Sequence, residues 1–168
     1  MTLISVLLAA TSWSSTVTGL PPGNQAEQAE ETWLGKLAIC QETWFDWKDD
    51  DRRMSKYLDR FNANFTHGED DPAYLPKGPG KVFGFPLIKV YPGSVGSGVG
   101  FSLELGGQFA KIRSQVERAL NMSLECSSSD GMTSCGVELG ENKNVVLTAF
   151  GNGDAAINLL GCYYTYEK

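Results

Sequence analysis

The segment between Cys126 and Cys135 constrains the fold more than any other stretch of this 168-residue chain. At its centre is Asp130-Gly131, a dipeptide typical of the two-residue type I′ turn of a β-hairpin. With that dipeptide as the loop, the two cysteines face each other in a pair without backbone hydrogen bonds, whose Cα atoms are about 4.5 Å apart. That separation is at the short end of what a disulfide accepts. The sequence therefore predicts an antiparallel hairpin closed by a Cys126–Cys135 disulfide.

The same register predicts which face of the hairpin is apolar. It places Leu124 opposite Val137 and Met122 opposite Leu139, on the face that carries both cysteines. Turn chemistry and hydrophobic alternation therefore favour the same register.

The other two cysteines, Cys40 and Cys162, form the second predicted disulfide, between an N-terminal helix and the last strand. The alternative is that these two are reduced structural cysteines in a cytosolic protein. The cysteine spacing fits no zinc site, which needs closely spaced Cys or His ligands. One conflict arises. Tight turns at Asn142-Lys143 and Asn152-Gly153 place Ile157 and Leu159 on the core face and turn Cys162 away from it. Either a turn length differs, a bulge intervenes, or the second disulfide does not form.

The N-terminus has the pattern of a secretory signal peptide. Residues 1–19 carry no charged side chain, and an apolar run from Leu3 to Ala10 precedes small and hydroxyl residues. The run is shorter than the about 20 residues that a membrane-spanning helix needs. Cleavage is expected after Gly19 or nearer Ala10. The alternative is an apolar strand or helix of the fold, because no Lys or Arg opens the segment. Together with the cysteines, this predicts a periplasmic or secreted protein.

Residues 20–168 are expected to form a single domain. The chain has 14 Lys and Arg against 20 Asp and Glu, a net charge of −6. Residues 20–75 hold 12 acidic and 6 basic residues, whereas residues 76–168 hold 8 of each. The acidity argues against nucleic-acid binding, which requires a basic surface. The domain is expected to have an acidic helical part (20–75) and a neutral sheet part (76–168).

Apolar residues recur at helical spacing in three segments, residues 26–49, 51–65 and 109–120. The stripes consist of Trp33, Leu37, Cys40, Trp44 and Trp47, of Met54, Tyr57, Leu58, Phe61 and Phe65, and of Phe109, Ile112, Val116 and Leu120. The first two segments predict a helical hairpin. On the third, Arg113 and Glu117 are spaced to form an ion pair.

Strand patterns occupy most of the remaining chain. Residues 82–91 contain Pro86, which indicates an edge or a bulge, and residues 99–105 alternate cleanly between apolar and small or polar side chains. Four more strands are predicted at about 122–128, 133–139, 144–150 and 157–166, and residues 66–80 are predicted to be a loop. The order α-α-β-β-α-β-β-β-β predicts an α+β fold, with the helices packed on a mostly antiparallel sheet.

No motif predicts catalysis, a metal or a cofactor. His67, the single histidine, lies in an acidic loop and is expected on the surface. The acidic runs at 46–51 and 69–71 lack the ligand spacing of an EF-hand. The glycine-rich residues 93–100 precede a strand rather than the helix N-terminus of a phosphate-binding loop.

The candidate contact residues are acidic or aromatic. Asp49, Asp50 and Asp51 provide negative charge, and Phe45 lies off the apolar stripe of its helix. Tyr164 and Tyr166 belong to the last strand, one face of which is expected to be open. An acidic helical hairpin suits a protein partner with a basic surface.

The sequence therefore favours a small exported binding protein without enzymatic activity, such as an inhibitor or an immunity-type protein. One alternative is a carboxylate-dependent hydrolase such as a glycosidase, which needs two carboxyl groups facing each other across a pocket. The other is a structural, envelope-associated module without a discrete ligand.

Overall fold

The computed structural model describes residues 33–43, 59–68, 73–95, 98–140, 142–151 and 156–165. The strands in these ranges are β1 (Phe65–His67), β2 (Tyr74–Pro76), β3 (Lys81–Val82), β4 (Phe85–Val95), β5 (Gly98–Leu105), β6 (Glu125–Ser129), β7 (Met132–Gly140), β8 (Lys143–Phe150) and β9 (Ile157–Thr165). Helix α3 spans Phe109–Leu120, and residues 33–38 and 59–64 are also helical. The protein is therefore mostly antiparallel sheet, with helices and two disulfides.

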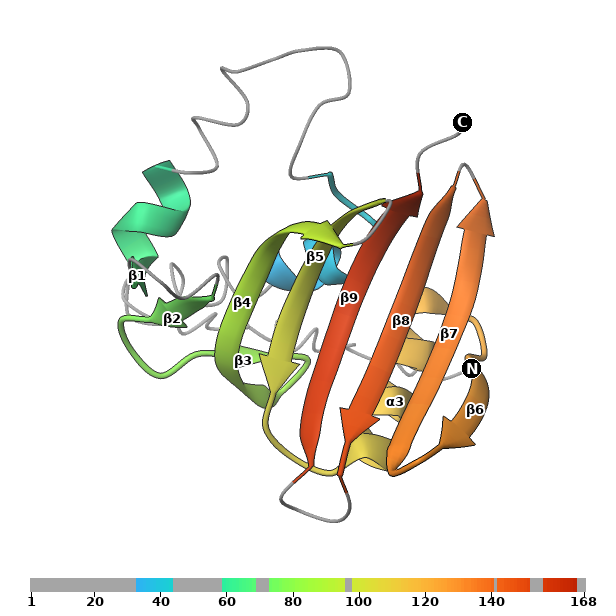
Figure 1. The fold of residues 1–168 in the computed structure, drawn as a ribbon. Helices are drawn as coiled ribbons and strands as arrows, with labels where there is room; N and C mark the ends of the chain where they lie inside the picture. Colours follow the sequence, from blue (N-terminus) through green and yellow to red (C-terminus); the bar gives the residue numbers. More distant parts are fainter. Residues whose placement is uncertain are drawn as a thin grey trace, which may run out of the picture.

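The strands pair in the order β1-β2-β4-β5-β9-β8-β7-β6, and β3 pairs with β4 outside this path. Every pairing is antiparallel. Figure 1 shows α3 and residues 33–38 behind the sheet. One face of the sheet, the core face, is thus covered by helices. The other is covered by no helix that the structure describes, and we call it the open face.

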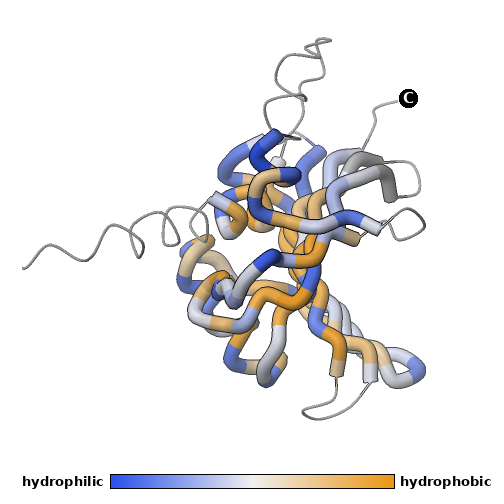
Figure 2. Tube along the Cα trace, turned by 90° about the vertical axis from the view of Figure 1, so that its left-hand side faces the viewer, coloured by the Kyte–Doolittle hydropathy of each residue, from blue (hydrophilic) through white to orange (hydrophobic). Residues whose placement is uncertain are grey.

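The hydrophobic core lies between the sheet and these helices. Ile112 and Val116 of α3 are fully buried, as are Leu103 of β5 and Leu160 of β9. In the edge-on view of Figure 2, the hydrophobic stretches lie mostly in the interior and the hydrophilic ones mostly at the periphery. The helix predicted at 109–120 and the strand predicted at 99–105 are confirmed as α3 and β5. The helix stripe and the strand residues Phe101, Leu103 and Leu105 all belong to this core or pack against it.

An aromatic cluster joins the N-terminal helical segments to the sheet. The ring of Phe61 lies 5.5 Å from Trp33, 5.6 Å from Phe65, 5.4 Å from Tyr74 and 6.0 Å from Phe101, measured between centroids. Tilted aromatic pairs at these distances stabilise a fold beyond the area they bury. The cluster explains why residues 59–64 pack close to both the first helical segment and β5.

The β6–β7 hairpin has the predicted register. Cys126 pairs with Cys135 at a Cα–Cα distance of 4.0 Å, and the two cysteines form a disulfide. Asp130 and Gly131 have φ angles of +47° and +78°, as a type I′ turn requires. Met122, however, is 42% exposed and precedes β6. Helix α3 ends in a left-handed Asn121, and Met122 donates its amide hydrogen back to a helix carbonyl, so it belongs to that helix end.

The second predicted disulfide, Cys40–Cys162, is also present, with a Cα–Cα distance of 5.2 Å. The conflict over the face of Cys162 is resolved by a β-bulge. The register of β7 and β8 shifts between Glu138 and Gly140, and a one-residue shift exchanges the two faces of every strand beyond it. Cys162 consequently faces the core, where it is fully buried.

The connection between β8 and β9 is longer than the Asn152-Gly153 turn, since β8 ends at Phe150 and β9 begins at Ile157. This extra length does not change which residues of β9 lie on the same face of the sheet as a given residue of β8. With the bulge, Ile157 and Leu159 lie on the open face rather than on the core face that two tight turns would give them.

The N-terminal helical part also differs from the prediction. The first helical segment ends at residue 38 instead of Asp49, because Cys40 has a φ of +59°. Cys40 and Gln41 donate their amide hydrogens to Leu37 and Lys36 over 3.2 and 2.8 Å, which is a Schellman helix end. Trp44, Trp47, Met54, Tyr57 and Leu58 lie outside the described residues.

Two short strands were missed in the region predicted as a loop. β1 and β2 pair with each other, and Tyr74 of β2 pairs with Val90 of β4. Phe65, predicted at the end of a helix, is the first residue of β1. Three-residue strands show no alternation long enough to be recognised in a sequence.

Candidate functional site

Side chains on the open face of the sheet bond to one another across strands. The contacts join Tyr91 to Glu104 at 3.0 Å, Ser102 to Tyr163 at 2.7 Å, and Ser134 to Thr148 at 3.1 Å. Gly161 lies beneath the second pair: a Cβ there would be 2.6 Å from Ser102 Oγ and 2.8 Å from the Tyr163 hydroxyl. The Tyr163 side chain thus packs directly on the backbone of β9, which fixes the middle of this face.

A row of apolar side chains crosses one end of the open face. Met132 on β7 pairs with Phe150 on β8, which pairs with Ile157 on β9. Their side chains are 39%, 44% and 48% exposed. We call these three residues the apolar row. Large apolar side chains that remain exposed together, rather than singly, are typical of contact surfaces.

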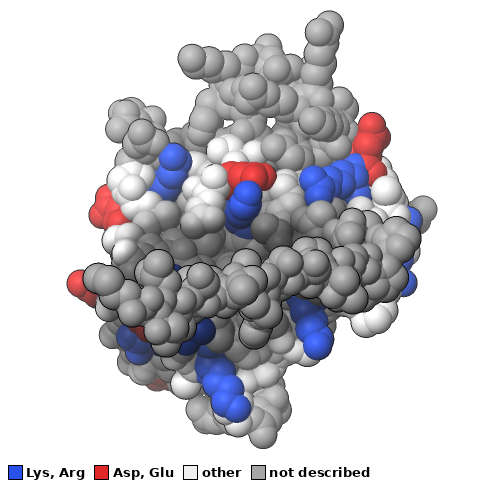
Figure 3. Space-filling model, turned by 180° about the vertical axis from the view of Figure 1, so that it is seen from behind, with Lys and Arg blue, Asp and Glu red and all other residues white. Residues whose placement is uncertain are grey.

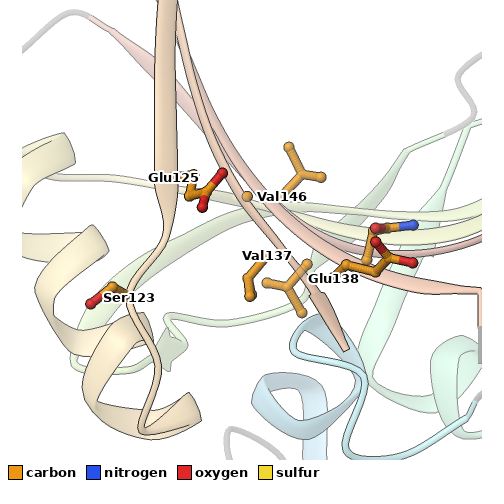
Figure 4. Close-up of a pocket in the computed structure, with 8 residues that line it drawn as sticks. Ser123, Glu125, Val137, Glu138 and Val146 are labelled. Carbon is orange, nitrogen blue, oxygen red and sulfur yellow. The ribbon is translucent and has the colours of Figure 1, made fainter. Parts of the chain in front are cut away.

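A cleft of about 520 Å³ lies where β6 begins, and its lining comes from the loop before β6 and from β6, β7 and β8. It is lined by Ser123, Glu125, Gly136, Val137, Glu138, Asn144, Val145 and Val146. The pairing of β6 with β7 begins at Glu125 and Gly136, whereas β7 continues to Gly140. In the view of Figure 4, Val137 and Val146 lie between Glu125 and Glu138. The cleft thus combines an aliphatic lining with two carboxylates.

A different carboxylate, Glu117 on α3, has a structural role. Its Oε1 accepts hydrogen bonds from the Leu124 amide at 3.0 Å and from Arg113 Nε at 2.9 Å, and Arg113 Nη2 donates to the Leu124 carbonyl at 3.0 Å. The hydrogen bond from the Leu124 backbone amide, together with the hydrogen bond and the positive charge of Arg113, lowers the pKa of Glu117 below its usual 4.5. The predicted Arg113–Glu117 pair is therefore present, and it fastens α3 to the chain entering β6.

The structure places few of the predicted contact residues. Phe45, Asp49, Asp50, Asp51 and Tyr166 lie outside the described residues. Tyr164 is only 3% exposed, because it lies on the core face of β9. It is therefore unavailable as the surface contact that the sequence predicted.

His67 lies at the end of β1, and its ring stacks against Tyr74 with 4.5 Å between centroids. No three His, Cys, Asp or Glu side chains gather into a possible metal site in the described ranges. Among the helices that the structure describes, none is both long and apolar enough to cross a membrane.

The apolar row and the cleft were missed in the sequence. The alternation of apolar and polar residues in β7, β8 and β9 shows which residues share a face, but it does not show which of the two faces is turned to the core. Before the bulge is known, the pattern assigns Ile157 to the core. The cleft depends on where β6 begins relative to β7, and strand ends are poorly defined by sequence.

Comparisons with known proteins give no relative: no family model, curated protein or solved structure matches the chain.

Proposed function

We propose that this chain is a small exported binding protein, periplasmic or secreted, that acts on a protein partner without catalysing a reaction. Two disulfides within a single chain favour an oxidising compartment, since thiols are kept reduced in the cytosol. The apolar leader expected at residues 1–19 points the same way. An inhibitor or an immunity-type protein would have these properties.

The apolar row is the observation that carries this proposal. Met132, Phe150 and Ile157 are held side by side on three paired strands and leave about two fifths or more of each side chain in water. A rigid apolar patch bordered by hydroxyl side chains suits a protein interface, where an apolar centre is surrounded by a polar rim. The partner is expected to cover this row.

The charge distribution favours a partner with a basic surface. The described residues hold nine basic and seven acidic side chains, so the acidic excess of the chain lies outside them. Figure 3 shows both Lys or Arg and Asp or Glu side chains on the helix-covered side, with the basic ones the more numerous. The open face carries Glu104, Glu125 and Glu138 against Lys89, as the strand registers place them. A basic partner would therefore approach the open face with favourable electrostatics.

The test uses serine variants of the row. Replacing Met132, Phe150 and Ile157 with Ser should abolish retention of the partner from an envelope or secreted extract of the source. The thermal midpoint should change little, since these side chains are not in the core. Leu75→Ser is the matched control, because Leu75 is also 44% exposed but lies on β2, outside the row. Retention of the same proteins by the triple variant and the wild type would contradict the proposal.

A second candidate, a carboxylate-dependent hydrolase such as a glycosidase, is favoured by one observation. Glu125 and Glu138 line the same cleft, and paired carboxylates are the usual catalytic groups of glycosidases. The test is hydrolysis of a panel of chromogenic glycosides by the wild type, Glu125→Gln and Glu138→Gln. Turnover that either substitution abolishes would replace the binding proposal, and no turnover would eliminate the hydrolase.

A further inference from the structure

We infer that the cleft between β6, β7 and β8 binds a cation carried on an aliphatic stem, and that its occupant is a Lys or Arg side chain of the protein partner. The inference extends the proposed function to a second contact, and it rests on that function for the source of the cation. The lining residues provide the negative charge, the apolar surface and the hydrogen-bond acceptors that such a side chain requires.

The charges come first. Glu125 and Glu138 line the cleft together, and its eight lining residues include no Lys or Arg. Neither carboxylate forms an ion pair within the described part of the chain. By contrast, Glu104 on the same face pairs in register with Lys89, and Glu117 is bonded to Arg113. The cleft therefore holds negative charge that the described fold leaves uncompensated.

The walls suit the stem of a long cationic side chain. Val146 lies on the same face as the two carboxylates and provides aliphatic surface, and Gly136 provides room. Val137, which is partly exposed, lines the cleft from the core-facing side of β7. A Cβ at Gly136 would lie 3.2 Å from the Val145 carbonyl oxygen and 3.6 Å from Val146 Cγ2. Lys and Arg bury their methylene stems against apolar surface while the charged head stays among polar groups. A small metal cation would gain nothing from such walls.

The oxygens at the cleft match the head group. Two carboxylates and the Asn144 side-chain amide are acceptors in the lining, and an ammonium offers three donors and a guanidinium five. Charge-assisted hydrogen bonds of this kind are roughly twice as strong as neutral ones. Because both glutamates are exposed, each contributes modestly, at the level of an exposed ion pair. A single residue is thus expected to bind weakly, in the millimolar range typical of small surface contacts.

The experiment is an NMR titration of the disulfide-bonded protein at low ionic strength. The probes are N-acetyl-arginine methylamide, N-acetyl-lysine methylamide, the uncharged N-acetyl-norleucine methylamide and 1,5-diaminopentane. The two cationic residues should shift the amide signals of Gly136, Glu138 and Val146, whereas norleucine should not. Glu125→Gln/Glu138→Gln should weaken binding about tenfold, since each exposed ion pair accounts for about threefold.

The matched control is Glu104→Gln, which removes a carboxylate from the same face outside the cleft and should leave the titration unchanged. Gly136→Ala should weaken binding by filling the cleft. Equal binding of norleucine, or equal binding by the double variant, would overturn the inference. Tighter binding of the diamine than of the capped residues would overturn the assignment to a protein side chain. These readouts need no partner, so they fail independently of the retention experiment on the apolar row.

Discussion

The two disulfides should stabilise the protein by different amounts, because they close loops of very different length. Cys40 and Cys162 are separated by 122 positions, and Cys126 and Cys135 by 9. In the chain-entropy model, the longer loop is worth about 5 kcal/mol and the shorter about 3 kcal/mol. Replacing both members of the long-range pair with Ala should therefore cost about 2 kcal/mol more than the same change in the hairpin.

The structure makes this comparison well matched. Each disulfide has one fully buried sulfur partner, Cys162 or Cys135, and one that is less buried, so the two double-alanine variants lose similar packing. The assay is urea unfolding under non-reducing conditions, with the free energy extrapolated to water and the slope checked for constancy. Equal losses from the two variants, or a larger loss from the hairpin variant, would refute the loop-entropy reasoning and assign the stabilisation to local packing instead.

Three further predictions concern single residues. The Glu117→Gln variant should be less stable than the wild type above pH 4.5, and the difference should shrink as the pH falls through the lowered pKa of Glu117, as urea titrations from pH 7 to 3 would show. Gly161→Ala should destabilise by about 1–3 kcal/mol, because its Cβ would meet Ser102 at 2.6 Å, whereas Gly93→Ala, with nothing within 4 Å, should have little effect. Asn158→Asp should lower the thermal midpoint by more than Asn158→Ala. In the wild type, three backbone carbonyl oxygens accept hydrogen bonds from the buried Asn158 amide, and the Asp variant would place a carboxyl group against them instead.

The parts of the fold that short-range chemistry determines were predictable from the sequence. Asp130-Gly131 restricts the turn to one type and so determines that Cys126 faces Cys135. Helix α3 was predicted over its full length, because Ile112 and Val116 recur at helical spacing in a segment without Gly or Pro. In both cases the deciding interactions span only a few residues.

The parts that depend on tertiary pairing were not predictable in the same way. The bulge after Glu138 leaves no signal beyond Gly140 and Asn142, which take φ angles of +79° and +60°. A glycine or an asparagine near a turn has many explanations. The first helical segment ends at residue 38, and the left-handed residue that terminates it is Cys40 rather than the usual Gly. Its sequence therefore gives no stop signal there. The candidate site was not predictable for the same reason, because the bulge determines which side chains of β8 and β9 lie on the open face.

The bulge and the apolar row have a common origin in the composition of β8 and β9. Both strands carry apolar side chains on both faces: Leu147 and Leu160 face the core, while Phe150 and Ile157 face outward. Hydrophobic alternation alone cannot select between two registers when each would bury large residues. The disulfide to Cys162 selects one, because only the bulged register turns that cysteine inward. The chosen register leaves Phe150 and Ile157 exposed on paired strands, although an outward polar residue would satisfy the fold equally well. Their apolar character is therefore unexplained by folding, and the proposed docking of a partner on the open face would account for it.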